Sequence, residues 1–308
     1  MTMTASSRPA HDLAAPEPDG GEDQARQPRS GWLPAAYLAV PMFVLFALFI
    51  VPMALLALIS VGMGINGAET MWSIEAYTSL LTDPLYLEIA RTTVIIATSA
   101  MVIQLVIGVP LAYIMAFKAG RFEIPMLLGL VVLDELNPVV RIYAWRMLLG
   151  RNGIMNGALE ALGIIDQPID ALLFNKGAVI VVLSTGWITY TIIPLYASMK
   201  AIDPKLFQAA QDLGAGWWTI ARRILLPLAA PGIFIAILLV YIPLFTDFAA
   251  PTLVGGTSSY MLGQAVNALI LDEGNLAGGS ALSLLLLGVS GVLAVLAYRL
   301  SRINRLET

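Results

Sequence analysis

The stretch Gln208-Ala-Ala-Gln-Asp-Leu-Gly214, followed ten residues later by Ile224-Leu-Leu-Pro227, is a polar interruption between two apolar runs. Asp203 can cap a helix that starts at Pro204, because proline has a fixed φ and no amide hydrogen to lose. Gly214 can supply the left-handed residue that ends such a helix. The pattern therefore predicts a short helix of about three turns.

A second short helix is expected from about Gly216, carrying two tryptophans and two arginines. We expect it to stop near Pro227, because proline lacks an amide donor and clashes with the preceding turn. In the first helix, Ala209 and Ala210 place almost no side chain on one side, so another protein could approach the backbone closely there. Residues 203–227 are therefore interpreted as a helix-turn-helix docking element rather than a catalytic one.

The composition indicates an integral membrane protein. The chain has 308 residues, of which 58% are hydrophobic and 12% are charged. A hydrocarbon layer of about 30 Å needs around 20 helical residues to cross it, and six apolar runs are long enough. They lie near Leu33–Met63, Thr92–Phe117, Ile124–Leu149, Ala178–Met199, Leu228–Phe248 and Ala281–Tyr298. The predicted fold class is all-α, with six transmembrane helices kinked by prolines at positions 41, 52, 110, 138, 194, 231 and 243.

Orientation follows from the 17 Lys and Arg residues, because positive residues in short loops stay on the cytoplasmic side. With both termini inside, twelve of them fall on the cytoplasmic side: Arg8, Arg26, Arg29, Lys118, Arg121, Lys200, Lys205, Arg222, Arg223, Arg299, Arg302 and Arg305. The opposite side receives Arg91, Arg151 and Lys176, and two more lie within the third run. We therefore expect both termini and residues 203–227 to be cytoplasmic.

Several functions are disfavoured by what the sequence lacks. It has no cysteine and one histidine, His11, so a thiolate or multi-histidine metal site is not expected. It has no Gly-x4-Gly-Lys-Ser/Thr phosphate loop, so the chain should not hydrolyse ATP by itself, and we expect neither a cofactor in this chain nor a nucleic-acid partner. Any energy from ATP must therefore come from a partner.

The first 30 residues differ in composition from the rest of the chain. They are rich in Pro, Gly, Asp, Glu, Gln and Ser, so they cannot bury enough apolar surface to offset the entropy of ordering. We predict a disordered cytoplasmic tail over 1–30 and a transmembrane domain over 31–308. The apolar run that begins at Trp32 is longer than the 7–15-residue core of a signal peptide, so the first span is expected to be retained.

The third apolar run contains charged residues, in Leu133-Asp-Glu-Leu-Asn-Pro-Val-Val-Arg141. A charge at mid-membrane costs about 2.5–3.5 kcal/mol on insertion scales, so these groups should face protein or water. Asp134 and Arg141 share a helical face and could form an internal ion pair. Alternatively, the acids line a solute pathway, where Pro138 opens the backbone. Candidate pathway residues are Asp134, Glu135, Asn137, Arg141, Tyr143 and, from the fifth run, Asp247. Their excess negative charge predicts a small cationic or amine-bearing solute.

The docking element resembles a known family motif. Ala209-Ala210, three residues, Gly214, nine residues and then Ile224-Leu-Leu-Pro227 is similar to the signature loop of ABC importer permeases. The resemblance implies a type I ABC importer permease-like bundle in which this loop forms a cytoplasmic coupling helix seated in a partner ATPase. It implies ATPase-coupling roles for Gln208, Ala209, Ala210, Asp212, Gly214, Ile224 and Pro227. The family usually has glutamate where Gln208 stands, so one charge of the contact is absent.

Further segments resemble the spermidine/putrescine (polyamine)-type branch of these permeases. They are Arg141-Ile-Tyr-Ala-Trp145, Leu162-Gly-Ile-Ile-Asp-Gln-Pro168, Pro194-Leu-Tyr-Ala-Ser198 and the stretch from Thr246-Asp-Phe to Gly255-Gly256. The likeness runs from about Thr92 to Leu269. Such relatives usually have apolar or aromatic residues at the positions of Asp134 and Glu135, so the exact substrate is not carried over.

The resemblance implies a set of partners in a bacterial inner membrane. They are a second permease subunit in a hetero-dimer, two cytoplasmic ATPase subunits that carry ATP and Mg, an external solute-binding protein and the lipid bilayer. The chain itself would be a non-catalytic translocation subunit. One alternative is an ion-coupled secondary transporter in which Asp134 and Glu135 exchange protons or sodium, and another is a membrane scaffold without transport. No internal repeat is visible, which disfavours two inverted halves in one chain.

Overall fold

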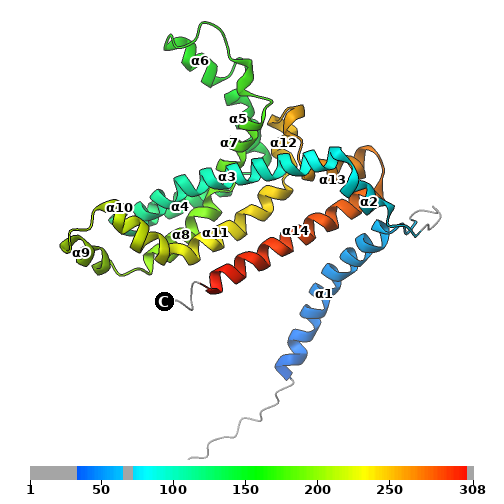
Figure 1. The fold of residues 1–308 in the computed structure, drawn as a ribbon, viewed down its shortest axis with the longest axis horizontal. Coiled ribbons are helices and arrows are strands. Elements are labelled where there is room, and N and C mark those ends of the chain that lie inside the picture. The colour runs from blue at the N-terminus through cyan, green and yellow to red at the C-terminus, as the bar shows by residue number, and fades with distance from the viewer. Residues whose placement is uncertain (1–32, 65–71, 304–308) are drawn as a thin grey trace, which may run out of the picture. The chain divides into compact units, whose positions relative to one another are not determined.

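The structure, a computed structural model, describes residues 33–64 and 72–303. The predicted tail, including His11, lies outside the described residues. Every regular element in the described ranges is helical (Figure 1). The α-helices are α1 (Leu33–Ser60), α2 (Glu75–Thr82), α3 (Pro84–Phe117), α4 (Glu123–Asp134), α5 (Pro138–Leu149), α6 (Ile154–Ala161), α7 (Lys176–Gly186), α8 (Ile188–Lys200), α9 (Lys205–Asp212), α10 (Trp217–Ile220), α11 (Leu226–Thr246), α12 (Ala249–Val254), α13 (Leu262–Asn267) and α14 (Leu276–Ile303).

Short 3₁₀ and π segments join several of these helices. The 3₁₀ segments are η1 (Gly120–Phe122), η2 (Asp170–Leu172) and η4 (Thr257–Ser259), and the π segments are η3 (Ala221–Leu225) and η5 (Ala268–Asp272). The chain divides into two units, residues 1–51 and 52–308. In the first, the described part is the beginning of α1, whose described side chains are mostly exposed and apolar.

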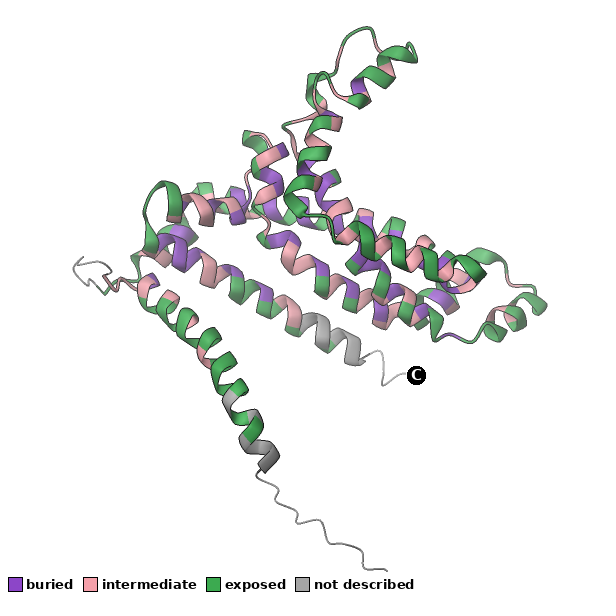
Figure 2. Cartoon of the chain, turned by 180° about the vertical axis from the view of Figure 1, so that it is seen from behind, coloured by how far each residue is buried: buried purple, intermediate pink, exposed green. Residues whose placement is uncertain are grey.

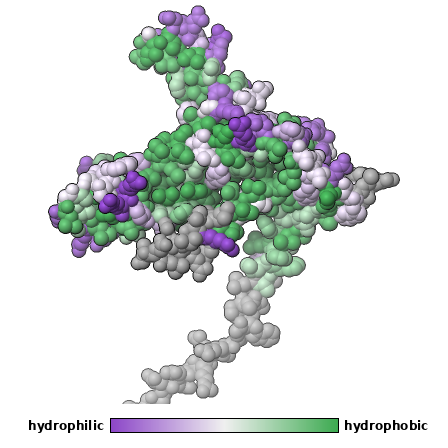
Figure 3. All heavy atoms as spheres, in the orientation of Figure 1, coloured by the Kyte–Doolittle hydropathy of each residue, from purple (hydrophilic) through white to green (hydrophobic). Residues whose placement is uncertain are grey.

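The second unit contains a helical bundle with two apolar core clusters. Helix α11 packs against α8 and α3, and α14 packs against α11 and α13. One cluster joins α3, α5 and α7 to the elements after α11, and the other joins the later part of α3 to α8 and α11. Buried residues lie where these helices face one another (Figure 2). Hydrophobic side chains also cover much of the outer surface of the bundle, as expected for contact with lipid (Figure 3).

The membrane-spanning helices match the predicted runs in part. By length and composition, four helical segments of the described chain are long and apolar enough to cross a membrane: Pro41–Ser60, Pro84–Phe117, Trp217–Thr246 and Leu276–Val295. The pair α7 and α8 makes a fifth if the two helices form one bent span. In the predicted third span over 124–149, the interruption expected at Pro138 is larger than a kink, because the chain leaves the helix after Asp134 and re-enters it at Pro138.

Helix α3 begins earlier than the predicted residue Thr92. The side chain of Asp83 accepts a hydrogen bond from the backbone N–H of Leu85 at 2.8 Å, and Pro84 occupies the first helical position. An acidic cap followed by proline is a strong helix start. This signal adds two turns of helix before the apolar run.

Helices α7 and α8 meet at an angle of 47°. The bend between them lies at Trp187 and not at Pro194, where a kink was predicted. Buried Gln104 of α3 bridges this bend. Its Nε2 donates to the Leu183 carbonyl at 3.0 Å, and its Oε1 accepts from the Thr191 hydroxyl at 2.6 Å. A carbonyl released where a helix bends needs a new donor, which the amide supplies. Pro194 lies inside the continuous helix α8.

The prediction that a helix stops near Pro227 is also wrong. Helices α10 and α11 run with η3 as one helical segment from Trp217 to Thr246. Pro227 lies in the first turn of α11, directly after the π turn of η3. A π turn changes the hydrogen-bond partners of the backbone, so the helix can pass a residue that lacks an amide donor.

Candidate functional site

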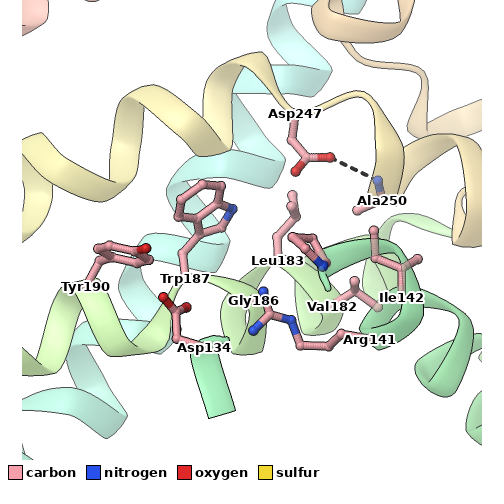
Figure 4. Close-up of a pocket in the computed structure, with 11 residues that line it drawn as sticks. Asp134, Arg141, Ile142, Val182, Leu183, Gly186, Trp187, Tyr190, Asp247 and Ala250 are labelled. Carbon is pink, nitrogen blue, oxygen red and sulfur yellow. Dashed lines mark hydrogen bonds between the residues drawn. The ribbon is translucent and has the colours of Figure 1, made fainter. Parts of the chain in front are cut away.

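A cavity of about 120 Å³ lies where the break between α4 and α5 meets the bend between α7 and α8 and the end of α11 (Figure 4). Its volume suits several water molecules or an ammonium group with neighbouring methylenes. The lining residues are Asp134, Pro138, Arg141, Ile142, Val182, Leu183, Gly186, Trp187, Tyr190, Asp247 and Ala250. Three predicted pathway residues, Asp134, Arg141 and Asp247, therefore meet at one site.

The other three predicted pathway residues do not line this cavity. The side chain of Asn137 accepts a hydrogen bond from the Val139 N–H at 2.9 Å, so Asn137 caps α5. Glu135 lies in the break and is exposed, and Tyr143 is exposed on α5. The break therefore brings only the first acid of the Asp134-Glu135 pair into the cavity.

Asp247 enters the cavity from the end of α11. One carboxylate oxygen accepts the N–H of Ala250 at 2.9 Å, which caps the start of α12 (Figure 4). The backbone at this point is closely packed, because a Cβ on Gly263 would lie 2.4 Å from the carbonyl oxygen of Thr246 and 2.7 Å from that of Asp247. Glycine at 263 thus allows α13 to hold Asp247 in place.

Asp134 and Arg141, predicted as a possible internal ion pair, line the same cavity without a direct salt bridge between them. Within residues 33–64 and 72–303, the ion pairs are Arg91–Glu88, Arg151–Asp170 and Lys200–Glu123. The guanidinium of Arg141 instead lies beside Gly186, the last residue of α7 (Figure 4). Carbonyl groups at a helix C-terminus carry partial negative charge, which stabilises a cation there. The carboxylate of Asp134 lies next to the hydroxyl of Tyr190.

Two aromatic residues of the cavity were missed by the sequence analysis. Trp187 lies at the bend and Tyr190 lies three positions further on the same face of α8, with ring centroids 5.6 Å apart. Glycine followed by tryptophan inside an apolar run was the signal available for this site. Two carboxylates, one guanidinium and two aromatic faces line the cavity, an arrangement that attracts a cation.

The predicted docking helix is present as α9. The Asp203 carboxylate accepts the Lys205 N–H at 2.9 Å, and Gly214 has a φ of +79°. The Ala215 N–H donates to the Ala210 carbonyl at 2.9 Å, which completes a Schellman-type end. The predicted end at Gly214 is confirmed. The start lies one residue later than predicted, because Pro204 rather than Asp203 stands at the N-cap position, and the helix has 8 residues, Lys205–Asp212, rather than about three turns.

The predicted coupling residues lie on the surface of α9 and the segment after it. Gln208, Ala209, Asp212, Gly214 and Pro227 are exposed, and Ala210 and Ile224 are partly buried. One side of α9, through Phe207, is held by aromatic contacts that the sequence analysis did not predict. The Phe207 ring packs against Phe117 at 5.1 Å, Phe117 against Tyr113 at 5.2 Å, and Tyr113 against Trp217 at 4.8 Å. These four rings form an aromatic anchor, and Gln208, Ala209 and Asp212 of α9 stay exposed beside it.

The chain has apolar helices of membrane length, a charged cavity where helices break, and an exposed docking helix. These features define a membrane permease that works with another protein. The chain belongs to the family of binding-protein-dependent transport system inner membrane components, whose family model matches residues 32–303. It is therefore the permease subunit of an ABC importer, and the resemblance seen in the sequence is confirmed.

Two similar relatives are spermidine/putrescine transport system permease proteins named PotB. The Haemophilus influenzae protein is 35% identical over 235 residues, which cover 76% of this chain and 80% of that protein. The Escherichia coli protein is 33% identical over 235 residues, covering 76% and 85%. These findings give no support to an ion-coupled secondary transporter.

Solved structures share the fold. A bacterial ABC transporter involved in the import of the acidic polysaccharide alginate matches with a TM-score of 0.71 and 17% identity, covering 88% of this chain and 95% of that chain. The MetNI methionine ABC transporter, in inward-facing conformations, matches with a TM-score of 0.50 and 17% identity, covering 72% and 99%.

Proposed function

We propose that this permease moves a small cationic or amine-bearing solute, polyamine-like in its chemistry, through the cavity. The observation that carries the proposal is the meeting of Asp134 and Asp247 with the rings of Trp187 and Tyr190. Carboxylates and aromatic faces both attract ammonium groups. The names of the PotB relatives, which refer to spermidine and putrescine, support the same solute class.

The contacts in this cavity suit passage rather than tight binding. Arg141 contributes a positive charge beside the two acids, and Asp247 already uses one oxygen to cap α12. A cationic solute would therefore meet partial compensation instead of an isolated carboxylate pair. Weak interactions at several points allow a transported solute to leave again.

The energy for transport is proposed to come from partner chains. Two ATPase subunits that bind ATP and Mg would contact Gln208, Ala209, Ala210 and Asp212 of α9, and their closure would move the helices between outward-open and inward-open arrangements. With glutamine at 208, this contact would use neutral hydrogen bonds. A second, different permease subunit would complete the pathway, and an external solute-binding protein would deliver the solute.

The test is uptake by the complete complex in proteoliposomes. Radiolabelled putrescine or spermidine is supplied with the external binding protein, and ATP with Mg is enclosed on the side of α9. We expect uptake to require ATP and the binding protein, and to persist when ionophores collapse the proton and sodium gradients. Gradient-driven uptake by this chain alone, without ATPase subunits, would contradict the proposal.

The proposed orientation has both termini and α9 in the cytoplasm. The chain has no cysteine, so single cysteines can report on sidedness. An impermeant thiol reagent added outside should label cysteines that replace Glu160 or Glu273, but not those that replace Arg121 or Lys205. The reverse labelling pattern would contradict the orientation.

A further inference from the structure

Three polar side chains meet at the end of the bundle that carries α9. The ammonium group of Lys200 donates to one carboxylate oxygen of Glu123 at 2.7 Å, and the hydroxyl of Tyr196 donates to the other oxygen. The Lys200 ammonium also lies 3.5 Å from the carbonyl oxygen of Ala116 in α3. We call Glu123, Tyr196 and Lys200 the polar clasp. It joins the first residue of α4 to the last turn of α8.

The clasp lies directly beside the connection to the docking helix. Lys200 is the last residue of α8, and α9 begins at Lys205. Between them, Ile202 is buried in the same core cluster as Met199, so the connection is packed and not loose. A displacement of α9 therefore acts on the end of α8, where Lys200 and Tyr196 hold Glu123.

Helix α4 is tied to α8 a second time, closer to the cavity. The Thr189 hydroxyl donates to the Leu130 carbonyl at 3.2 Å. Apolar side chains of α4, including Met126 and Leu127, pack against the core cluster that contains α8. Helix α4 is therefore joined to α8 by hydrogen bonds at two places and by a shared apolar surface. Because of these contacts, we expect the two helices to move together.

The far end of α4 lies at the cavity. Asp134, its last residue, lines the cavity, and the chain then leaves the helix until Pro138. The Glu135 N–H still donates to the Val131 carbonyl of α4, and the Asn137 carbonyl already accepts from the Arg141 N–H of α5, so the change of direction falls between these two caps. A rotation of α4 relative to α5 would be taken up there. Tyr190, near the beginning of α8, lines the same cavity.

We propose that Glu123 is a positioning residue that transmits movement of α9 to the cavity. When α9 moves, α8 carries Lys200 and Tyr196, and the clasp carries α4 with them. Asp134 and Tyr190 then change position together, which alters access to the cavity. The inference rests on the proposed function, in which α9 contacts the ATPase.

The experiment measures solute imported per ATP hydrolysed in the reconstituted complex. Parental ATP-dependent amine uptake is established first, so failure of the proposed function appears there and not in the variants. Glu123→Lys and Lys200→Glu should each lower the solute imported per ATP by about tenfold, the effect of losing a charge-assisted hydrogen bond. The doubly substituted complex, with the charges exchanged, should recover most of the parental value.

Controls separate transmission from simple loss of stability. Glu123→Gln keeps the shape of the side chain and removes its charge, so it should uncouple ATP hydrolysis from uptake while ATPase activity and thermal stability stay close to parental. Glu88→Gln breaks an exposed ion pair with Arg91 that is remote from α9, and it should change neither quantity. Parental solute import per ATP in Glu123→Gln, or no recovery in the charge exchange, would overturn the proposal.

Discussion

Replacement of Gly214 tests whether the docking helix depends on its left-handed end. Gly214 has a φ of +79°, and a Cβ added there would meet nothing within 4 Å. The effect of Gly214→Ala is therefore backbone strain alone, without a steric clash. An L-residue in the left-handed region costs about 1–2 kcal/mol, and a β-branched residue such as valine costs more.

This strain acts on the part of α9 that carries the coupling residues. The Gly214 N–H donates to the Gln211 carbonyl at 2.8 Å, and the Ala215 N–H donates to the Ala210 carbonyl at 2.9 Å. Both hydrogen bonds require the left-handed turn. Because about 1.4 kcal/mol corresponds to a tenfold change in an equilibrium constant, the ratio of the native end of α9 to its unwound form should fall about tenfold.

The assay is ATP-dependent uptake by the reconstituted complex, beside solute binding by the external protein. Gly214→Val should lower uptake by about tenfold or more while solute binding persists. Gly214→Asn should lower it less, because asparagine tolerates the left-handed region. Gly216→Ala is the matched control, since Gly216 has a φ of −70° and open space around its Cβ position. Parental uptake by Gly214→Val, or an equal loss in Gly216→Ala, would refute the reasoning.

Three further substitutions test the packing that supports the site. Gly232→Ala should destabilise the bundle by about 1–3 kcal/mol, because its Cβ would lie 2.5 Å from that of Ser198 on α8; an unchanged thermal unfolding midpoint would contradict this. Phe207→Ala removes the edge-to-face contact with Phe117. Such a ring pair contributes about 0.5–1.5 kcal/mol of stability beyond that of the buried area, so the solute imported per ATP should fall. An unchanged ratio would show that the aromatic anchor is dispensable. Gln104→Leu leaves the Leu183 carbonyl and the Thr191 hydroxyl without their partner at the bend. Each unpaired buried group costs about 1–3 kcal/mol of folding free energy, so the thermal unfolding midpoint should fall. A stabilised variant would exclude this role.

Local signals in the sequence predicted the parts of the structure that depend on neighbouring residues. The ends of α9 follow from Asp203 and Gly214, whose effects reach only a few residues along the chain. The apolar runs likewise predicted where long helices occur. Asp83 and Pro84 were an equally local signal, although the predicted second span did not use it.

Features that depend on packing between distant segments were not predictable in the same way. The bend at Trp187 has no proline and relies on Gln104, which lies in another helix. Pro227 was expected to end a helix, whereas the π turn before it allows the helix to continue. The spacing of Asp134 and Arg141 on one helical face suggested an internal ion pair, while Pro138 between them suggested an opening of the backbone. The break removed that geometry, and tertiary packing brought both residues to Asp247.

The central claim is that carboxylates of the cavity guide an amine through this permease. The most direct measurement is the rate of ATP-dependent putrescine or spermidine uptake by complexes that carry Asp134→Asn or Asp247→Asn. Asparagine keeps the cap of α12 at position 247, so the change removes charge with little effect on the fold. Glu135→Gln is the control, because Glu135 is exposed and does not line the cavity.

We predict that each aspartate variant lowers uptake by about tenfold, the effect of losing one charge-assisted contact. The control should stay near the parental rate, and the external protein should bind the solute as before. Parental uptake by both aspartate variants, or a preference of the parental complex for an anionic solute, would contradict the account.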